Sequence, residues 1–209
     1  YSLGPVLSEY YSGKTQGEIW GYVTDKMAKS ESDLTHAPNQ SYIYSGALRL
    51  GDIIYQDLNG DGIIDRGLST LDDKGDLAVI GNTTPRYQYS FGGDIEWKGL
   101  SVSVFFQGVG KKDWMPATLA LKEPPVDNPV YFWGGGTGAF HHAFFKNHYE
   151  AIYRPADTPD IEGGPNPDGW LPRIYSSTES LKNQQPQTGY IQNAAYLRLK
   201  NITVGYTFP

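Results

Sequence analysis

The sequence predicts an all-β protein whose long antiparallel strands belong to a transmembrane barrel, and three observations support this prediction. Residues 86–107 alternate polar and apolar side chains with a period of two, and residues 201–208 of the stretch 196–208 do so again. Eleven residues at about 3.3 Å each, tilted near 45°, span roughly the 25 Å apolar band of an outer-membrane barrel. The chain also contains 25 Gly and 14 Pro, which long helices tolerate poorly.

The clearest alternation runs over residues 87–97 and resumes at residue 100. In the first run the odd positions are Tyr, Tyr, Phe, Gly, Ile and Trp, while the even positions are Gln, Ser, Gly, Asp and Glu. In the second run Leu, Val, Val and Phe at 100, 102, 104 and 106 share one face, and Ser, Ser and Gln at 101, 103 and 107 share the other. Gly99 follows Lys98 between the runs and supplies the positive φ that a two-residue turn needs. We therefore predict a hairpin over residues 86–107.

A third strand is predicted over residues 196–208. Ile, Val, Tyr and Phe at 202, 204, 206 and 208 alternate with Asn, Thr, Gly and Thr, and aromatic residues gather towards the ends, as in the interfacial girdles of membrane barrels. The polar face would then line a wet lumen. A large soluble β-sandwich is the alternative, because its strands also alternate and its inner face is also apolar.

Composition excludes several classes of protein. No run of 18 apolar residues is present, so no transmembrane helix is predicted. The chain has no Cys, which excludes disulfides and thiolate metal sites, and its net charge of −6 argues against a nucleic-acid partner. It begins at Tyr1 without Met or signal peptide and stops at Pro209 directly after a strand-like run, so we expect a fragment of a longer protein.

The first 85 residues show weaker patterns. Residues 18–24 (EIWGYVT) fit a strand or part of a folded loop, and residues 26–34 (KMAKSESDL) are the one helix-compatible piece. Two brief strand candidates, YIYS and DIIYQ, lie between residues 42 and 56.

Residues 57–65 (DLNGDGIID) have the spacing of a calcium-binding loop. Hard cations take six to eight oxygen ligands, and carboxylates at alternate positions of a tight loop converge when Gly permits the turn. Position 12 is Leu68, so the bidentate Glu of a complete EF-hand is missing. Either Asp72 or Asp73 completes the shell, or the site is weak, or the segment is a metal-free Asx-rich turn. The candidate ligands are Asp57, Asn59, Asp61, the carbonyl of Ile63, and Asp65.

Residues 108–195 show no strong period and are rich in Pro, Gly, Asn and aromatics. A segment of this length without regular structure is typical of the outer loops of large barrels, where recognition often takes place. Aromatic faces in it could stack on sugar rings or apolar peptide side chains, or form the core of the loop itself. The candidate ligand-binding residues are Trp114, Tyr131, Trp133 and Trp170, and none of the tryptophans is expected in a strand.

Several separated stretches, in this order, resemble the SusC/RagA-like TonB-dependent outer-membrane receptors. They extend from about residue 19 to the end of the chain. The resembling stretches are IWGY at 19–22, LGDIIYQDLNGDGIID at 50–65, VIGN at 79–82 with PRY at 85–87, VFFQG at 104–108, YLRLKN at 196–201 and GY at 205–206.

The resemblance implies a large, 22-stranded antiparallel barrel with long extracellular loops and an N-terminal plug. Residues 1–85 would be mainly extracellular loop, 86–107 a strand hairpin, 108–195 a long extracellular loop and 196–208 a strand. The family imports oligosaccharides or peptides with a SusD-like surface lipoprotein, and the TonB complex would contact parts absent from this chain. We therefore expect an outer-membrane importer in contact with lipid and not an enzyme. A secreted, calcium-stabilised β-sandwich that binds carbohydrate is the competing hypothesis.

Overall fold

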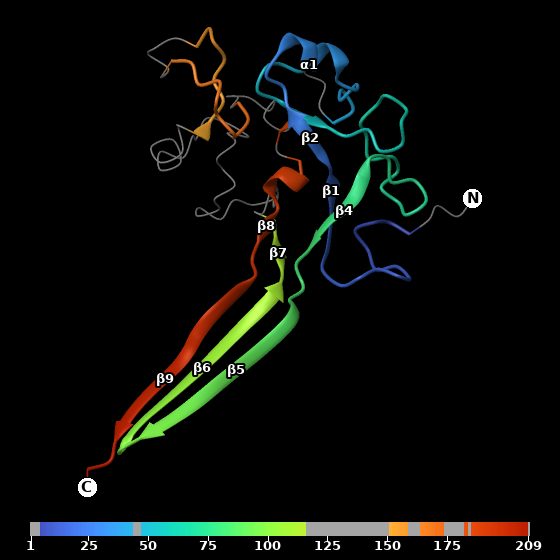
Figure 1. Ribbon diagram of the computed structural model, residues 1–209. Coiled ribbons are helices and arrows are strands. Elements are labelled where there is room, and N and C mark those ends of the chain that lie inside the picture. The colour runs from blue at the N-terminus through green and yellow to red at the C-terminus, as the bar shows by residue number, and fades with distance from the viewer. Residues whose placement is uncertain are drawn as a thin grey trace, which may run out of the picture.

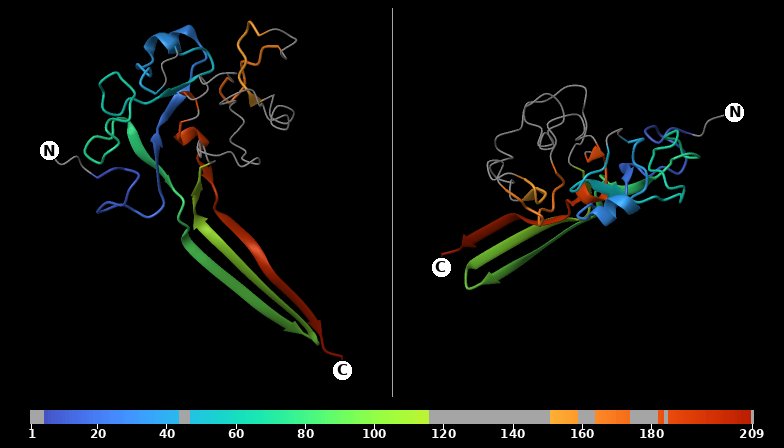
Figure 2. Two further views of the ribbon diagram at one scale, coloured as in Figure 1. Left: turned by 180° about the vertical axis from the view of Figure 1, so that it is seen from behind. Right: turned by 90° about the horizontal axis from the view of Figure 1, so that it is seen from above.

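The computed structural model describes residues 5–43, 47–115, 151–158, 164–173, 182–183 and 185–208. The regular structure in these residues is mostly β-strand, with one α-helix, α1 (Glu31–His36), so the fold is all-β. In the described part of the chain, no helix has the length and apolar character needed to cross a membrane. A long three-stranded sheet projects away from a more irregular part that holds α1 and the short strands (Figure 1). The two further views show the same projection (Figure 2).

The long sheet has the antiparallel order β5-β6-β9. Its strands are β5 (Arg86–Trp97), β6 (Leu100–Lys111) and β9 (Tyr196–Tyr206). The first two form the predicted hairpin, in which both turn residues have positive φ, 47° at Lys98 and 84° at Gly99. A turn with positive φ at both central residues has a backbone twist that matches the right-handed twist of the two strands it joins. Strand β6 runs four residues beyond the predicted end of the hairpin.

A β-bulge in β9 keeps its apolar side chains in phase with β6. Phe105 pairs with Asn201, but Phe106 pairs with Leu199, so Lys200 is an extra residue. Leu197 and Leu199 stand at odd positions, whereas Ile202 and Val204 stand at even ones. Without the bulge these two pairs would lie on opposite faces, because strands have a period of two. The bulge therefore corrects a phase change that is present in the sequence.

The irregular part contains two small antiparallel pairs. Strand β1 (Glu18–Tyr22) pairs with β4 (Leu77–Asn82), and β2 (Thr24–Met27) pairs with β3 (Ile53–Tyr55). Buried side chains from these strands and the following loop form a core with partly buried apolar neighbours. The core residues are Tyr22, Ile53, Tyr55 and Ile64, packed against Met27, Ile43 and Leu77.

The segment just before β9 docks on β2 and β3 through a buried polar network. Lys182 Nζ lies 2.7 Å from Asp52 Oδ2, and these side chains are 3% and 0% exposed. The Asn183 amide donates to Asp52 and accepts from the backbone N–H of Ile53, each at 2.9 Å. Strand β7 (Asp113–Trp114) then pairs with β8 (Gln192–Asn193), which lies next to β9 along the chain. The ends of the segment between β7 and β8 are thus held together.

Three expectations about local structure were wrong or displaced. Residues 26–27, at the start of the expected helix, belong to β2 (Thr24–Met27). The helix begins later, at Glu31, because Ser30 and Asp33 cap it reciprocally. Residues 41–43 form a turn, so the described part of the YIYS candidate is not a strand. Trp114 lies in β7, contrary to the expectation that none of Trp114, Trp133 and Trp170 belongs to a strand.

Candidate functional site

The two faces of the long sheet differ completely in charge. In the pairing register, every charged residue of its three strands falls on one face. The opposite face carries aliphatic and aromatic side chains, and many are exposed, including Ile95 (71%), Trp97 (65%) and Val204 (64%). The charged residues are Arg86, Asp94, Glu96, Lys111, Arg198 and Lys200.

Aromatic residues mark both ends of the apolar face. Tyr89 lies at one end, with its ring against Gly108. Trp97 and Tyr206 lie at the other end. Lys98 Nζ is 5.0 Å from the centroid of the Trp97 ring. Between these ends Phe91 stacks on Phe106 with centroids 5.1 Å apart. Aromatic girdles on either side of an apolar band are typical of strands that cross a bilayer.

The predicted calcium-binding loop is closed by its own hydrogen bonds. Asp57 accepts from the backbone N–H groups of Gly60 (2.6 Å) and Gly62 (2.7 Å). The hydrogen bond from Gly62 is the main cause of a lowered Asp57 pKa. Asn59 and Asp61 each accept from the N–H two residues further on. These contacts are those of Asx-turns, the alternative that the sequence left open.

Asp65 also accepts a backbone hydrogen bond, from Gly67 at 2.7 Å. In the described residues, no three His, Asp or Glu side chains converge closely enough to hold a metal ion. All five predicted ligands lie in one exposed to half-buried loop, and calcium binding there stays a prediction. A metal would have to draw carboxylate oxygens away from these N–H groups or share them.

Asp76, which the sequence analysis missed, anchors this loop. It is fully buried and accepts from the backbone N–H groups of Leu58 (2.7 Å) and Asp65 (2.9 Å). Buried Gln40 holds the backbone of β3 in the same way: its amide donates to the Ile53 carbonyl oxygen at 3.0 Å and accepts from the Tyr55 N–H at 2.7 Å. No local pattern distinguishes these buried polar residues from exposed ones.

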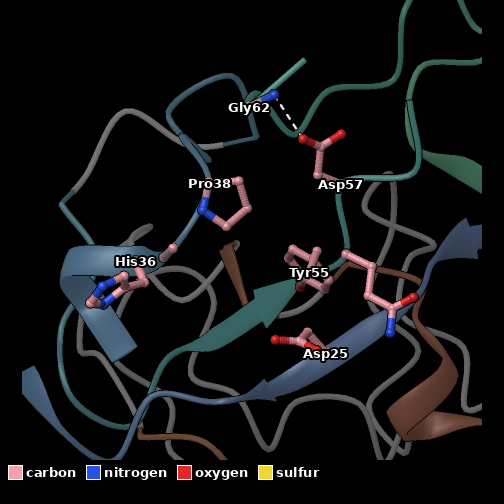
Figure 3. A pocket seen from close by; sticks show the side chains of 8 residues that line it. Asp25, His36, Pro38, Tyr55, Asp57 and Gly62 are labelled. Atoms are coloured by element: carbon pink, nitrogen blue, oxygen red, sulfur yellow. Dashed lines mark hydrogen bonds between the residues drawn. The ribbon is translucent and has the colours of Figure 1, made fainter. Parts of the chain in front are cut away.

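An open cleft of about 610 Å³ lies beside the loop. Asp57 and Gly62 form one wall, the end of α1 forms another, and Asp25 comes from β2 (Figure 3). The lining is largely polar, so the cleft can offer hydrogen bonds to a polar solute. Its lining residues are Asp25, His36, Ala37, Pro38, Tyr55, Gln56, Asp57 and Gly62.

The structure places two of the four predicted ligand-binding aromatics. Trp114 is 44% exposed in β7, and Trp170 is 71% exposed. Tyr131 and Trp133 lie outside the described residues, so no surface shared by all four is visible.

Comparisons with known proteins place the chain beside one class of receptor. The chain is similar to TonB-dependent receptors. It is 25% identical to the TonB-dependent receptor P26 of Formosa agariphila over 77% of this chain and 13% of that protein. It is also 25% identical to the TonB-dependent receptor P3 of the same organism, over 94% of this chain and 16% of that protein. No protein-family model matches. The chain thus spans less than a fifth of the length of either relative.

Proposed function

We propose that this chain is part of a TonB-dependent outer-membrane importer of nutrient oligosaccharides or peptides. The observation that carries the proposal is the long sheet, with all its charges on one face and exposed apolar side chains on the other. Burying a charged residue in hydrocarbon is costly, whereas apolar side chains are stable there. The similarity to two proteins named as TonB-dependent receptors supports the same class. Catalysis is not part of the proposal.

The edges of the sheet favour a barrel over a soluble sandwich. Among the described residues, β5 and β9 each pair on one side only, with β6. Unpaired backbone groups cannot remain in a bilayer, so further strands of the same protein would pair with both edges. A sandwich would instead need a second sheet over the apolar face, and no described strand packs there. We propose a large barrel, of 22 strands if it follows the SusC/RagA pattern.

The tight Lys98–Gly99 turn sets the proposed orientation. Periplasmic turns of such barrels are short and outer loops are long, so this turn would face the periplasm. The irregular part would then lie on the cell surface, where a SusD-like lipoprotein could close over it. The calcium loop, if occupied, would stabilise this outer surface through oxygen ligands alone.

A pair of neighbouring substitutions tests the membrane assignment. Val104 lies in mid-strand on the apolar face, and Ser103 lies beside it on the charged face. In the full-length receptor, Val104→Lys should lower barrel stability by about 2–4 kcal/mol, while Ser103→Lys should be much milder. Heat-modifiability gels and denaturant titration in detergent would measure both. Equal effects, or a larger effect at Ser103, would contradict the assignment of the apolar face to lipid.

Growth tests import itself. A strain lacking the whole receptor should fail on at least one oligosaccharide or peptide source that the parent strain uses. Replacing the exposed Trp170 together with Trp133 by Ala should weaken uptake without abolishing it, because one aromatic contact contributes only about 0.5–1.5 kcal/mol beyond its area. Normal growth of the deletion strain on every source tested would refute import.

A further inference from the structure

On the charged face of the long sheet, the aromatic ring of Phe105 lies in mid-strand between polar side chains. Phe105 lies on this face, because it pairs with Gly92 on one side and Asn201 on the other, and it is 41% exposed. A Cβ added at Gly92 would come within 3.3 Å of the Phe105 ring and 2.7 Å of the Val104 carbonyl oxygen. The ring therefore leans over the bare backbone of Gly92, which leaves an apolar platform on the charged face. Val109 and Tyr196 share this face, further along the strands.

Polar groups of opposite charge flank this platform. On the β9 side, the bulge places Lys200 and Asn201 together on the charged face, and Arg198 follows one pair further along. On the β5 side, Asp94 is next to the platform along the strand. Asp94, Lys200 and Asn201 are exposed, and their side chains make no hydrogen bond or ion pair with any other described residue.

The spacing of the strands suits one sugar ring. Neighbouring strands lie about 4.8 Å apart, so β5 and β9 are separated by about 10 Å with Phe105 between them. A pyranose ring on Phe105 could direct hydroxyl groups towards Asp94, which accepts hydrogen bonds, and a negative substituent towards Lys200. β-Bulges frequently re-aim side chains beside binding sites, and here the bulge adds a cation at the level of the platform.

We propose that Phe105, Lys200, Asn201 and Asp94 form a subsite for an acidic sugar unit, one bearing a carboxylate or sulfate, on the lumen wall. This inference rests on the proposed import function and narrows it to anionic oligosaccharides. Arg198 strengthens the positive side of the subsite, and its guanidinium lies 5.1 Å from the Tyr196 ring centroid. Neutral sugars would gain the aromatic contact but not the charge attraction.

Binding to the full-length receptor in detergent tests the subsite. The probes are hexasaccharides of polygalacturonate, alginate and carrageenan, with laminarin and xylan hexasaccharides as neutral controls. At least one acidic probe should bind, more weakly as salt rises. Phe105→Ala should weaken that binding about tenfold, and Lys200→Gln should weaken it and flatten the salt dependence. Gly92→Val, which displaces the ring but keeps it, should act like Phe105→Ala.

A control variant and the growth of the deletion strain complete the test. Val102→Ala lies on the opposite face of β6 and should leave binding unchanged in correctly folded receptor. The subsite would be overturned if the wild-type receptor bound only neutral probes or no probe at all. It would also be overturned if Phe105→Ala and Lys200→Gln bound the acidic probes with wild-type affinity. A growth defect of the deletion strain confined to neutral glycans or peptides would leave import standing and remove only this inference. Normal growth of that strain on all sources would remove both.

Discussion

Replacing Lys182 with Met would remove the ammonium group that is paired with the buried carboxylate of Asp52. The Lys182 ammonium lies 2.7 Å from Asp52 Oδ2 and donates to the Ala47 carbonyl oxygen at 2.8 Å, inside a site that is closed to water. Breaking a buried ion pair by removing one partner typically costs about 3–5 kcal/mol, because the remaining charge is uncompensated. At 1.36 kcal/mol per factor of ten, local opening should become more frequent by roughly 100-fold to several thousand-fold.

Hydrogen exchange in the full-length receptor measures this opening directly. The backbone N–H of Ile53 donates to Asn183 Oδ1, and that of Thr24 donates to Thr188 Oγ1, both at 2.9 Å. These amides lose their partners when residues 182–190 detach from β2 and β3. In Lys182→Met they should exchange faster by the factor above, while amides of the long sheet should keep their protection.

Two further variants test whether the faster exchange comes from the buried charge of Asp52. Lys26→Met breaks an ion pair in which Lys26 is 50% exposed, so it should leave exchange near the wild-type rate. The double variant Asp52→Asn with Lys182→Met should recover most of the protection, because neither charge of this pair remains. Wild-type exchange in Lys182→Met, or a double variant as unprotected as the single one, would refute the reasoning.

Three other predictions concern single positions. Gly51 and Gly60 both have strongly positive φ, but only at Gly51 would a Cβ collide with a ring, so Gly51→Ala should destabilise the receptor by about 1–3 kcal/mol more than Gly60→Ala in thermal melts. Asp57 has a folded pKa below its ordinary value of about 3.9, so its stabilisation of the loop is present above that pH and is lost as pH falls through the folded pKa. The protection factor of the Gly62 amide, its exchange rate relative to an unstructured chain at the same pH, should therefore be steady down to about pH 4 and fall below it, and a fall beginning near neutral pH would contradict this. Lys98 should escape biotin labelling of intact cells while residues 125–170 are reached, and the reverse pattern would overturn the proposed orientation.

The candidate site was predictable only in part. The loop at residues 57–65 and its alternating oxygen ligands could be recognised from spacing, and the alternative of a bare Asx-rich turn was visible at the same stage. Asp72 or Asp73 as the closing calcium ligand stays a prediction, and the sequence did not point to buried Asp76, which bonds two backbone N–H groups of the loop. Spacing alone cannot show which of the neighbouring aspartates is buried against the loop. In the structure it is Asp76, the residue directly before β4.

What the sequence by itself determined is the all-β class, the hairpin and the two unlike faces of the long strands. Each follows from contacts between neighbours in sequence or across one tight turn, so a period of two and Gly99 are sufficient to specify them. The phase change at Lys200 was not predicted, and the pairing of β6 with β9 identified it as a bulge. Tertiary structure alone decided that Lys182 and Asn183 reach Asp52, which lies 131 residues from Asn183. Such pairs leave no local period, because burial there depends on how the chain returns to β2 and β3 and not on adjacent residues.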